Sequence, residues 1–333
     1  MDRITIPRRQ FLAATAAAAS TSLVGLPAWA KAAYPSKPVR FIVPFNPGGA
    51  TDIVARVLAE AMSKKLGQPV IVENKAGASA MLGTDMVAKS APDGYNVVVS
   101  LSTSLLINQF LYTKMAYNPQ KDLLMLSLLA SAPVTLVVHP SVPANNMKEL
   151  LAWVKAHKGK VSYGSWGVGS YAHLGGAYMS KSMDADMTHV AYKGEAPMIQ
   201  ELIGGQLQLC FSSAQNTKPF IDSGRLKAIG VTGKSRMSVL PQLPTIYEQG
   251  VTDDAYAIAG FVGMALPAGT PKDVVDVLSA AIQDAAQDPK VKERIDGAGF
   301  LPVFSSPEGF AKTYAQAAPV WKSLIEVADA RVD

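Results

Sequence analysis

The sequence lacks several features, including paired cysteines, runs of basic residues and catalytic motifs, and each absence excludes a class of protein. It holds a single cysteine, Cys210, in 333 residues, which excludes an intramolecular disulfide and a zinc site built from cysteines. The 31 lysine and arginine residues exceed the 26 aspartate and glutamate residues by only five, and the basic residues form no long run. No nucleic-acid partner is therefore expected. The chain also lacks a nucleophile elbow, a two-histidine zinc motif and a Walker loop. We therefore expect no catalytic residues, no metal site and no cofactor.

Long hydrophobic runs are absent after the first thirty residues. Within those thirty, Arg8-Arg9 opens a twin-arginine leader, an apolar stretch covers 13–26, and Ala28-Trp29-Ala30 has the small-x-small pattern that signal peptidase reads. The alternative is a membrane anchor, but the apolar stretch is short and rich in alanine. We expect a signal peptide over 1–30, cleaved near Ala30, and a mature protein in the periplasm.

Short apolar strands alternate with amphipathic helices through the rest of the chain, which favours parallel α/β sheets. Hydrophobic residues make up 49% of the sequence and charged residues 17%, as in globular proteins. Thr51 or Asp52 is expected to cap the first helix, and Gly67 to end it. Strands are expected at 39–43, 70–73, 95–100, 161–164, 188–191, 208–211, 226–231 and 257–266, and helices at 53–66, 81–90, 146–157, 170–183, from 271, and at 307–328.

The C-terminal helices have no sheet of their own, so they are expected to return to the first group of strands. This predicts an α/β protein of two lobes, with lobe 1 over 34–133 plus 257–333 and lobe 2 over 134–256. The chain would cross between the lobes near 133–139 and near 257–266. Two crossings form a hinge, and a cleft between two α/β lobes is where ligands bind.

The loops that follow the strands are small and rich in hydroxyl groups. Gly48-Gly49 lies between a strand and a helix, where bare N–H groups and the helix dipole favour a carboxylate. The alternative is that the glycines only make a tight turn and Asp52 only caps the helix. Similar loops recur at 73–80, 100–104 and 163–170, and none contains arginine, which leaves Lys75 as the nearest cation. The carboxyl ends of the strands are where such sheets bind ligands.

The chain resembles the solute receptors of the tripartite tricarboxylate transporters, known as Bug receptors. The resemblance covers essentially the whole mature chain. It rests on the stretch from Tyr34 to Asp52 with Asn46-Pro47-Gly48-Gly49-Ala50-Thr51-Asp52, and on Leu66-Gly67-Gln68-Pro69-Val70, Val72-Glu73-Asn74-Lys75-Ala76-Gly77, Ala91-Pro92-Asp93-Gly94-Tyr95, Tyr192-Lys193-Gly194, 202–209 and Leu243-Pro244-Thr245.

This resemblance implies a type II periplasmic binding fold that closes on a small organic acid and delivers it to membrane subunits of a transporter. It also implies that ordered waters and main-chain groups of the first lobe hold the ligand carboxylate. We expect a monomer, and no enzyme. Together with the loop pattern, the expected ligand-binding residues are Phe45, Asn46, Gly48, Gly49, Ala50, Asp52, Ala78, Ser79, Ser102, Thr103, Ser165, Trp166, Gly169, Ser170, His173, Tyr192, Gly194 and Ala196.

Four alternatives stay open from the sequence. Trp166 either stacks on an aromatic ligand or covers a hydrophobic patch, and His173 either touches a carboxylate or is a hydrogen-bonded helix histidine. Gly167-Val168-Gly169-Ser170-Tyr171-Ala172 fits a dinucleotide fingerprint, which would indicate an exported nicotinamide-dependent oxidoreductase, but no acidic residue ends the following strand. A loaded receptor can also serve as a sensor for a signalling kinase.

Overall fold

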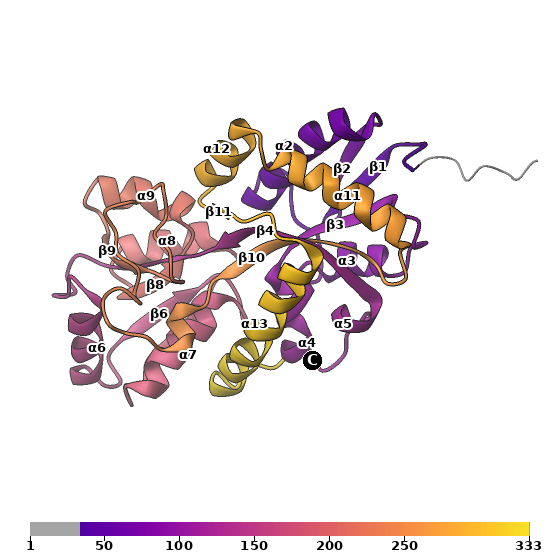
Figure 1. Ribbon diagram of the computed structural model, residues 1–333. Helices are drawn as coiled ribbons and strands as arrows, with labels where there is room; N and C mark the ends of the chain where they lie inside the picture. The colour runs from indigo at the N-terminus through magenta and orange to yellow at the C-terminus, as the bar shows by residue number, and fades with distance from the viewer. Residues whose placement is uncertain (1–33, 333) are drawn as a thin grey trace, which may run out of the picture. The chain divides into compact units, whose positions relative to one another are not determined.

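The computed structural model describes residues 34–332, so the expected signal peptide lies outside the described residues. All the helices and strands discussed below belong to one compact unit, Lys37–Asp333 (Figure 1). Within the described part of the chain, no helix combines the length and the apolar character that crossing a bilayer requires.

The first sheet has six strands in the order β11-β4-β10-β3-β1-β2. β1, β2 and β3 run parallel, whereas β10 runs antiparallel to both β3 and β4. The sheet is therefore mixed and not purely parallel, because the antiparallel β10 is inserted near its centre. The strands are β1 (Val39–Val43), β2 (Val70–Asn74), β3 (Asn96–Leu101), β4 (Leu123–Ala132), β10 (Gly260–Pro267) and β11 (Leu301–Pro302).

The second sheet has five strands in the order β7-β6-β8-β5-β9. β6 pairs in parallel with β7 and β8, and β5 pairs antiparallel with β8 and β9. This sheet is also mixed, as the two-lobed binding fold requires. The strands are β5 (Thr135–Val138), β6 (Ser162–Ser165), β7 (Thr188–Ala191), β8 (Leu209–Ser212) and β9 (Lys227–Val231).

Helices cover both sheets. α11, from the C-terminal part of the chain, packs on α2, as expected, and α13 packs on β4 and also on α7 beside the second sheet. The helices are α2 (Ala50–Leu66), α3 (Met81–Ala88), the π-helical turn η1 (Thr103–Ile107), α4 (Asn108–Leu111), α5 (Pro119–Asp122), α6 (Met147–Ala156), α7 (Tyr171–Ser182), α8 (Glu195–Ile203), α9 (Ala214–Asp222), α10 (Asp254–Ala257), α11 (Lys272–Ala285), α12 (Pro289–Gly297) and α13 (Pro307–Val327).

Local sequence signals explain where several helices begin and end. α2 ends at Gly67, whose φ of 65° is the left-handed conformation that glycine adopts without strain. The Asn146 side chain accepts from the Glu149 N–H and opens α6, as a capping box predicts. The expected cap of α2 is wrong, because Gly49 occupies the N-cap and Asp52 turns back to the loop before it.

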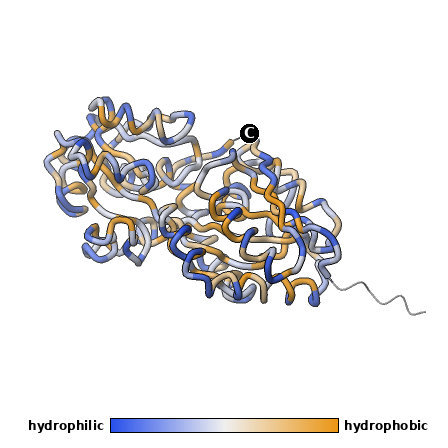
Figure 2. Tube along the Cα trace, turned by 90° about the horizontal axis from the view of Figure 1, so that it is seen from above, coloured by the Kyte–Doolittle hydropathy of each residue, from blue (hydrophilic) through white to orange (hydrophobic). Residues whose placement is uncertain are grey.

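The core lies between the strands and the helices that cover them. Figure 2 shows the hydrophobic stretches mainly inside the trace and the hydrophilic ones mainly along its outside. Phe41 in β1, Phe211 in β8 and Trp321 in α13 are among the largest fully buried side chains. Cys210, in β8, is a free, fully buried cysteine, as expected, and burial raises the pKa of its thiol. This packing fixes the strand ends on which the site is built.

Candidate functional site

A cavity of about 420 Å³ lies where the ends of strands from both sheets meet. In the first sheet β1 and β3 point their carboxyl ends toward it, and antiparallel β10 begins there at Gly260. In the second sheet the loops after β6 and β8 reach it, because these two strands are parallel. The cavity therefore lies at the edge where open α/β sheets bind ligands. Its volume suits a small molecule.

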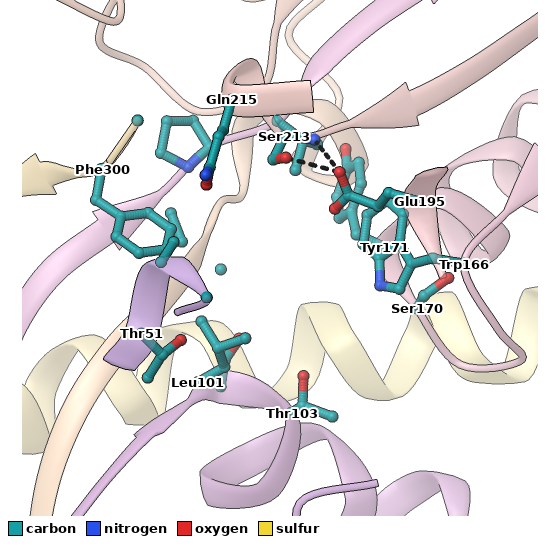
Figure 3. Close-up of a pocket in the computed structure, with 18 of the residues that line it drawn as sticks. Thr51, Leu101, Thr103, Trp166, Ser170, Tyr171, Glu195, Ser213, Gln215 and Phe300 are labelled. Carbon is teal, nitrogen blue, oxygen red and sulfur yellow. Dashed lines mark hydrogen bonds between the residues drawn. The ribbon is translucent and has the colours of Figure 1, made fainter. Parts of the chain in front are cut away.

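The first wall of the cavity comes from the first sheet. It consists of the β1–α2 loop with the first turn of α2 and of the residues around η1. Figure 3 shows Thr51, Leu101 and Thr103 on this side. The lining residues are Phe45, Gly49, Ala50, Thr51, Leu101, Ser102, Thr103 and Ile107.

The first turn of α2 offers main-chain donors to the cavity. The N–H groups of Gly49, Ala50 and Thr51 precede the first intrahelical bond, which Ile53 donates to the Gly49 carbonyl. No described residue accepts a hydrogen bond from these three groups. Together with the positive end of the helix dipole, they form a place for a negatively charged oxygen.

Asp52 holds this turn in shape from beneath. Its side chain is 2% exposed, and its Oδ2 accepts from the Gly48 N–H and from Arg56 Nε, each at 2.9 Å. Its Oδ1 accepts from Asn74 Nδ2 at 2.9 Å. Burial opposes the charged form, but the hydrogen bonds from Arg56, Gly48 and Asn74 outweigh it and lower the pKa of Asp52. The Gly48 N–H and the Asp52 carboxylate are thus engaged within the loop, and neither residue lines the cavity.

Ser102 and Thr103 present hydroxyl groups beside the α2 turn. They lie where β3 passes into η1, and such π-helical turns frequently occur at functional sites. The Ser102 Oγ accepts from the Phe261 N–H of β10 at 3.4 Å, which ties the turn to the central strand. Both residues, which the sequence predicts to bind the ligand, line the cavity.

The second wall comes from the second sheet. Trp166 is half-buried; it packs against core side chains and also lines the cavity. The packing agrees with the interpretation that it covers a hydrophobic patch, and stacking on an aromatic ligand stays a prediction. Ser170 caps α7 by accepting from the His173 N–H. The lining residues of this wall are Trp166, Gly169, Ser170, Tyr171, Glu195, Ser213, Gln215 and Asn216.

His173 supports the second wall from behind. It is 7% exposed, does not line the cavity, and its Nδ1 accepts from the Gly169 N–H at 3.2 Å. Its ring stacks on His189 at 4.1 Å, and His189 Nε2 is 2.7 Å from the Ser165 Oγ. Burial, and then the neighbouring His189, lower the pKa of His173 to about 4. The structure thus places His173 as a hydrogen-bonded helix histidine.

The pKa of His173 predicts that acid weakens the fold. Below the ordinary imidazole pKa of 6.5 the unfolded chain binds a proton at this residue, whereas the folded chain does so only near pH 4. The free energy of unfolding should therefore fall as the pH drops through this window, by about 2 kcal/mol between pH 7 and pH 5. Urea denaturation at both pH values measures the fall.

The matched variants for this pH effect are His173→Asn and His139→Asn. His139 follows β5, which lies between β8 and β9 in the second sheet. His173→Asn should remove most of the additional acid sensitivity, and His139→Asn should retain it. An unchanged difference between pH 7 and pH 5 in the His173 variant would assign the acid sensitivity to other groups.

Several lining residues were not expected from the sequence. Glu195 lies between two expected residues, and Ser213, Gln215 and Asn216 follow β8 in a loop that repeats the strand–hydroxyl–helix pattern. That repetition is a signal that the sequence contained. No comparable signal marks the lining residues that come from the ends of β4 and β9, from the start of β10 and from the C-terminal part of the chain: Ala132, Pro133, Val134, Thr232, Gly260, Ala298, Gly299, Phe300 and Trp321.

Other expected residues lie outside this cavity. Ala78 and Ser79 follow β2, the outermost strand of the first sheet, and Ser79 Oγ is bonded to the Tyr112 hydroxyl at 2.7 Å. Lys75 lies on the same loop and pairs with Glu73 at 3.7 Å. Ser165 is fully buried beneath the second wall. The expected residues that do not line the cavity are Asn46, Gly48, Asp52, Ala78, Ser79, Ser165, His173, Tyr192, Gly194 and Ala196.

Among residues 34–332 no group of three or more histidine, cysteine, aspartate or glutamate side chains is arranged to hold a metal ion. Gly169, from the dinucleotide-like sequence, lines the cavity, but Gly167 does not.

Comparison with known proteins places this geometry in a family. BugT of Bordetella pertussis is 32% identical over 300 residues, which cover 90% of this chain and 91% of BugT. The structure of the periplasmic binding protein BugD is 36% identical, with a TM-score of 0.73 over 90% of this chain and 99% of BugD. MatC of Rhodopseudomonas palustris, solved with bound malate, is 30% identical, with a TM-score of 0.72 over 88% of this chain and 100% of MatC.

BugD is a periplasmic binding protein and MatC was solved with bound malate, so the comparisons do not favour an oxidoreductase. The family model described as "Tripartite tricarboxylate transporter family receptor" matches residues 54–329, and the chain belongs to this family of receptors.

Proposed function

We propose that this protein is a periplasmic receptor that captures a small organic carboxylate in the cavity between its two sheets and delivers it to a tripartite tricarboxylate-type transporter. The observation that carries the proposal is the first turn of α2. There the N–H groups of Gly49, Ala50 and Thr51 border the cavity without a partner among the described residues. A carboxylate accepts such donors without any basic side chain.

The rest of the cavity suits the remainder of a small acid. The hydroxyl groups of Thr51, Ser102 and Thr103 add donors beside the α2 turn, directly or through water. Phe45 and Phe300 supply apolar surface for a carbon skeleton. MatC, which has the same fold and is 30% identical, was solved with bound malate, which supports a carboxylate as the ligand class.

Capture requires that the walls separate and close. In our proposal the lobes are 34–133 plus 257–333 and 134–256, and the hinge includes the crossing segments that line the cavity. The first crossing is anchored to the end of β9 by hydrogen bonds between Val134 and Thr232, at 2.9 Å and 3.0 Å. Closure removes competing water and strengthens each hydrogen bond to the ligand.

The proposal also covers export and partners. The leader over 1–30 directs the chain to the periplasm and is cleaved near Ala30, which fits a family that includes the periplasmic binding protein BugD. The loaded receptor acts as a monomer and is recognised by the membrane subunits of the transporter, which release the ligand.

A leucine at Gly49 is the test of this site. Gly49 has an ordinary φ of −74°, and a Cβ there lies 3.7 Å from the Asn46 carbonyl oxygen, so the fold accepts a side chain. The leucine would cover the α2 donors, so we expect binding of organic acids to fall at least about a hundredfold, the loss of roughly two charge-assisted hydrogen bonds. Calorimetric titration with acids found in a thermal-shift screen measures the loss.

The matched control is Gly297→Leu, at an exposed glycine of α12 with open space around it. It should bind like the unmodified chain. If Gly49→Leu binds with unchanged affinity, the carboxylate site is not at the α2 turn. If no organic acid raises the melting temperature of the unmodified protein, the proposed function itself fails.

A further inference from the structure

Glu195 is the only charged side chain among the described residues that line the cavity. It is the first residue of α8 and lies on the second wall, across from Thr51 of α2 in Figure 3. The described lining includes no lysine, arginine or histidine. Among the described residues that line the cavity, the proposed receptor for an anion thus has a carboxylate as its one charged side chain.

Hydrogen bonds fix one oxygen of Glu195. Its Oε2 accepts from the Ser212 Oγ and the Ser213 Oγ, both at 2.6 Å, from the Ser213 N–H at 3.1 Å, and from Asn216 Nδ2 at 2.7 Å. Figure 3 shows the two bonds from Ser213. These donors come from the end of β8 and the start of α9, so they hold the side chain against the wall. The N-termini of α8 and α9 both favour its negative charge.

The other oxygen, Oε1, has no hydrogen-bond partner and no ion-pair partner among residues 34–332. Within the same range no salt bridge involves Glu195, although its carboxylate accepts four bonds through Oε2. A carboxylate oxygen that lines a closing cavity needs a donor, because an unpaired charge costs more as water leaves. A ligand in the cavity can supply this donor when the walls close.

We propose that Glu195 binds the protonated amine of a zwitterionic ligand, whose carboxylate binds the first turn of α2. This inference rests on the proposed function and narrows its ligand class to amino acids. The donors of α2 and the acceptor of Glu195 lie on opposite walls, so one short molecule with opposite charges at its two ends satisfies both. Trp166 also lines the second wall of the cavity, where its indole face can add a cation–π contact to an ammonium group.

The same arrangement disfavours acids with two carboxylates. A second carboxylate that reached the second wall would meet the Glu195 charge in a cavity from which water is being removed, where repulsion is strong. Specificity then comes from an unfavourable contact with the wrong ligand as well as a favourable one with the right ligand.

Matched pairs of ligands test the proposal. Calorimetric titration of the full mature chain compares γ-aminobutyrate with glutarate and δ-aminovalerate with adipate, which differ only in an amine or a carboxylate at one end. The α-amino acids are screened alongside them by thermal shift. We expect the best amine-bearing acid to bind at least about tenfold more tightly than any dicarboxylate of the set, the effect of one charge-assisted hydrogen bond.

Glu195→Gln removes the charge and keeps the shape of the side chain. It should weaken the amine-bearing ligand by about ten- to a hundredfold and leave the dicarboxylates unchanged or tighter. The control is Glu201→Gln, which removes the same charge from an exposed position of α8 that does not line the cavity, and which should change neither class. If Glu195 only braces the loop after β8, the Gln variant will weaken both ligand classes equally or neither.

The outcomes separate this inference from the proposed function. Binding of nitrogen-free acids as tight as that of amino acids, or an unchanged preference in Glu195→Gln, overturns the amine site and leaves the carboxylate receptor standing. Failure of every acid, with or without an amine, overturns both.

Discussion

Gly169→Ala is expected to weaken ligand binding by about a hundredfold. A Cβ on Gly169 would overlap the side chain of Leu111, with Leu111 Cδ1 at 2.9 Å. Leu111 ends α4, on the first-sheet side of the cavity, and is 3% exposed. Overpacking of this kind costs about 1–3 kcal/mol, and the φ of 78° adds strain for a residue with a Cβ. In the proposed mechanism, separation of the walls relieves the overlap, so we expect the cost to fall on the closed, ligand-bound state.

Gly167→Ala is the control for Gly169→Ala. Gly167 has a positive φ of 142° and lies in the same loop, and a Cβ added to it would have no neighbouring atom within 4 Å. It thus shares the backbone strain but not the overlap, and we expect binding to change by less than about tenfold. Adding Leu111→Ala to Gly169→Ala should restore part of the affinity. Calorimetry with the best ligand of the unmodified chain measures all three variants, and equal losses in the two glycine variants would refute an interlobe contact at Leu111.

Trp321→Ala is expected to lower the free energy of unfolding by about 3–5 kcal/mol, the usual cost of truncating a buried tryptophan. Trp321 is 1% exposed and packs edge-on against Tyr171 with ring centroids 5.8 Å apart. It belongs to α13 and Tyr171 begins α7, so the pair joins the C-terminal helix to the second wall of the site. Urea denaturation followed by circular dichroism measures the loss.

Trp321→Phe tests how much of this stabilisation an aromatic ring without the indole N–H retains. Trp321 lines the cavity, and its buried Nε1 has no hydrogen-bond partner among residues 34–332. Phenylalanine keeps an aromatic ring without the N–H, so we expect it to cost no more than about 1.5 kcal/mol. A loss below about 1 kcal/mol in the alanine variant would show that this ring does not support the fold.

Local patterns predicted most elements of the fold. Apolar runs gave the strands at 39–43 and 188–191 with the bounds that the structure has, and Gly67 and Asn146 marked helix ends correctly. β4 was not expected, and the antiparallel insertion of β10 had no local signal. Strand order depends on pairing between distant residues, which no periodicity encodes.

The sequence predicted only part of the site, because it reveals local features and not contacts between distant residues. The loops after β1, β3 and β6 line the cavity, and they could be predicted because a strand-to-helix loop with small residues is a local feature. The loop with Ala78 and Ser79 has that feature but lies at the sheet edge, since β2 is the outermost strand. In the sequence, Glu195 resembles any ordinary acid in a first helical turn. Only its contacts with Ser212, Ser213 and Asn216, distant in sequence, show that it belongs to the cavity wall.

The position of β10 between β3 and β4 governs the order in which the chain can fold. All strands of the second sheet lie between β4 and β10 in the sequence, so that sheet has every strand before β10 leaves the ribosome. Until β10 has been synthesised, the first sheet lacks the strand that pairs with both β3 and β4. Its assembly must close a loop of more than a hundred residues, which slows folding. The α2 turn and its partner wall therefore become a binding site only after nearly the whole chain has been synthesised.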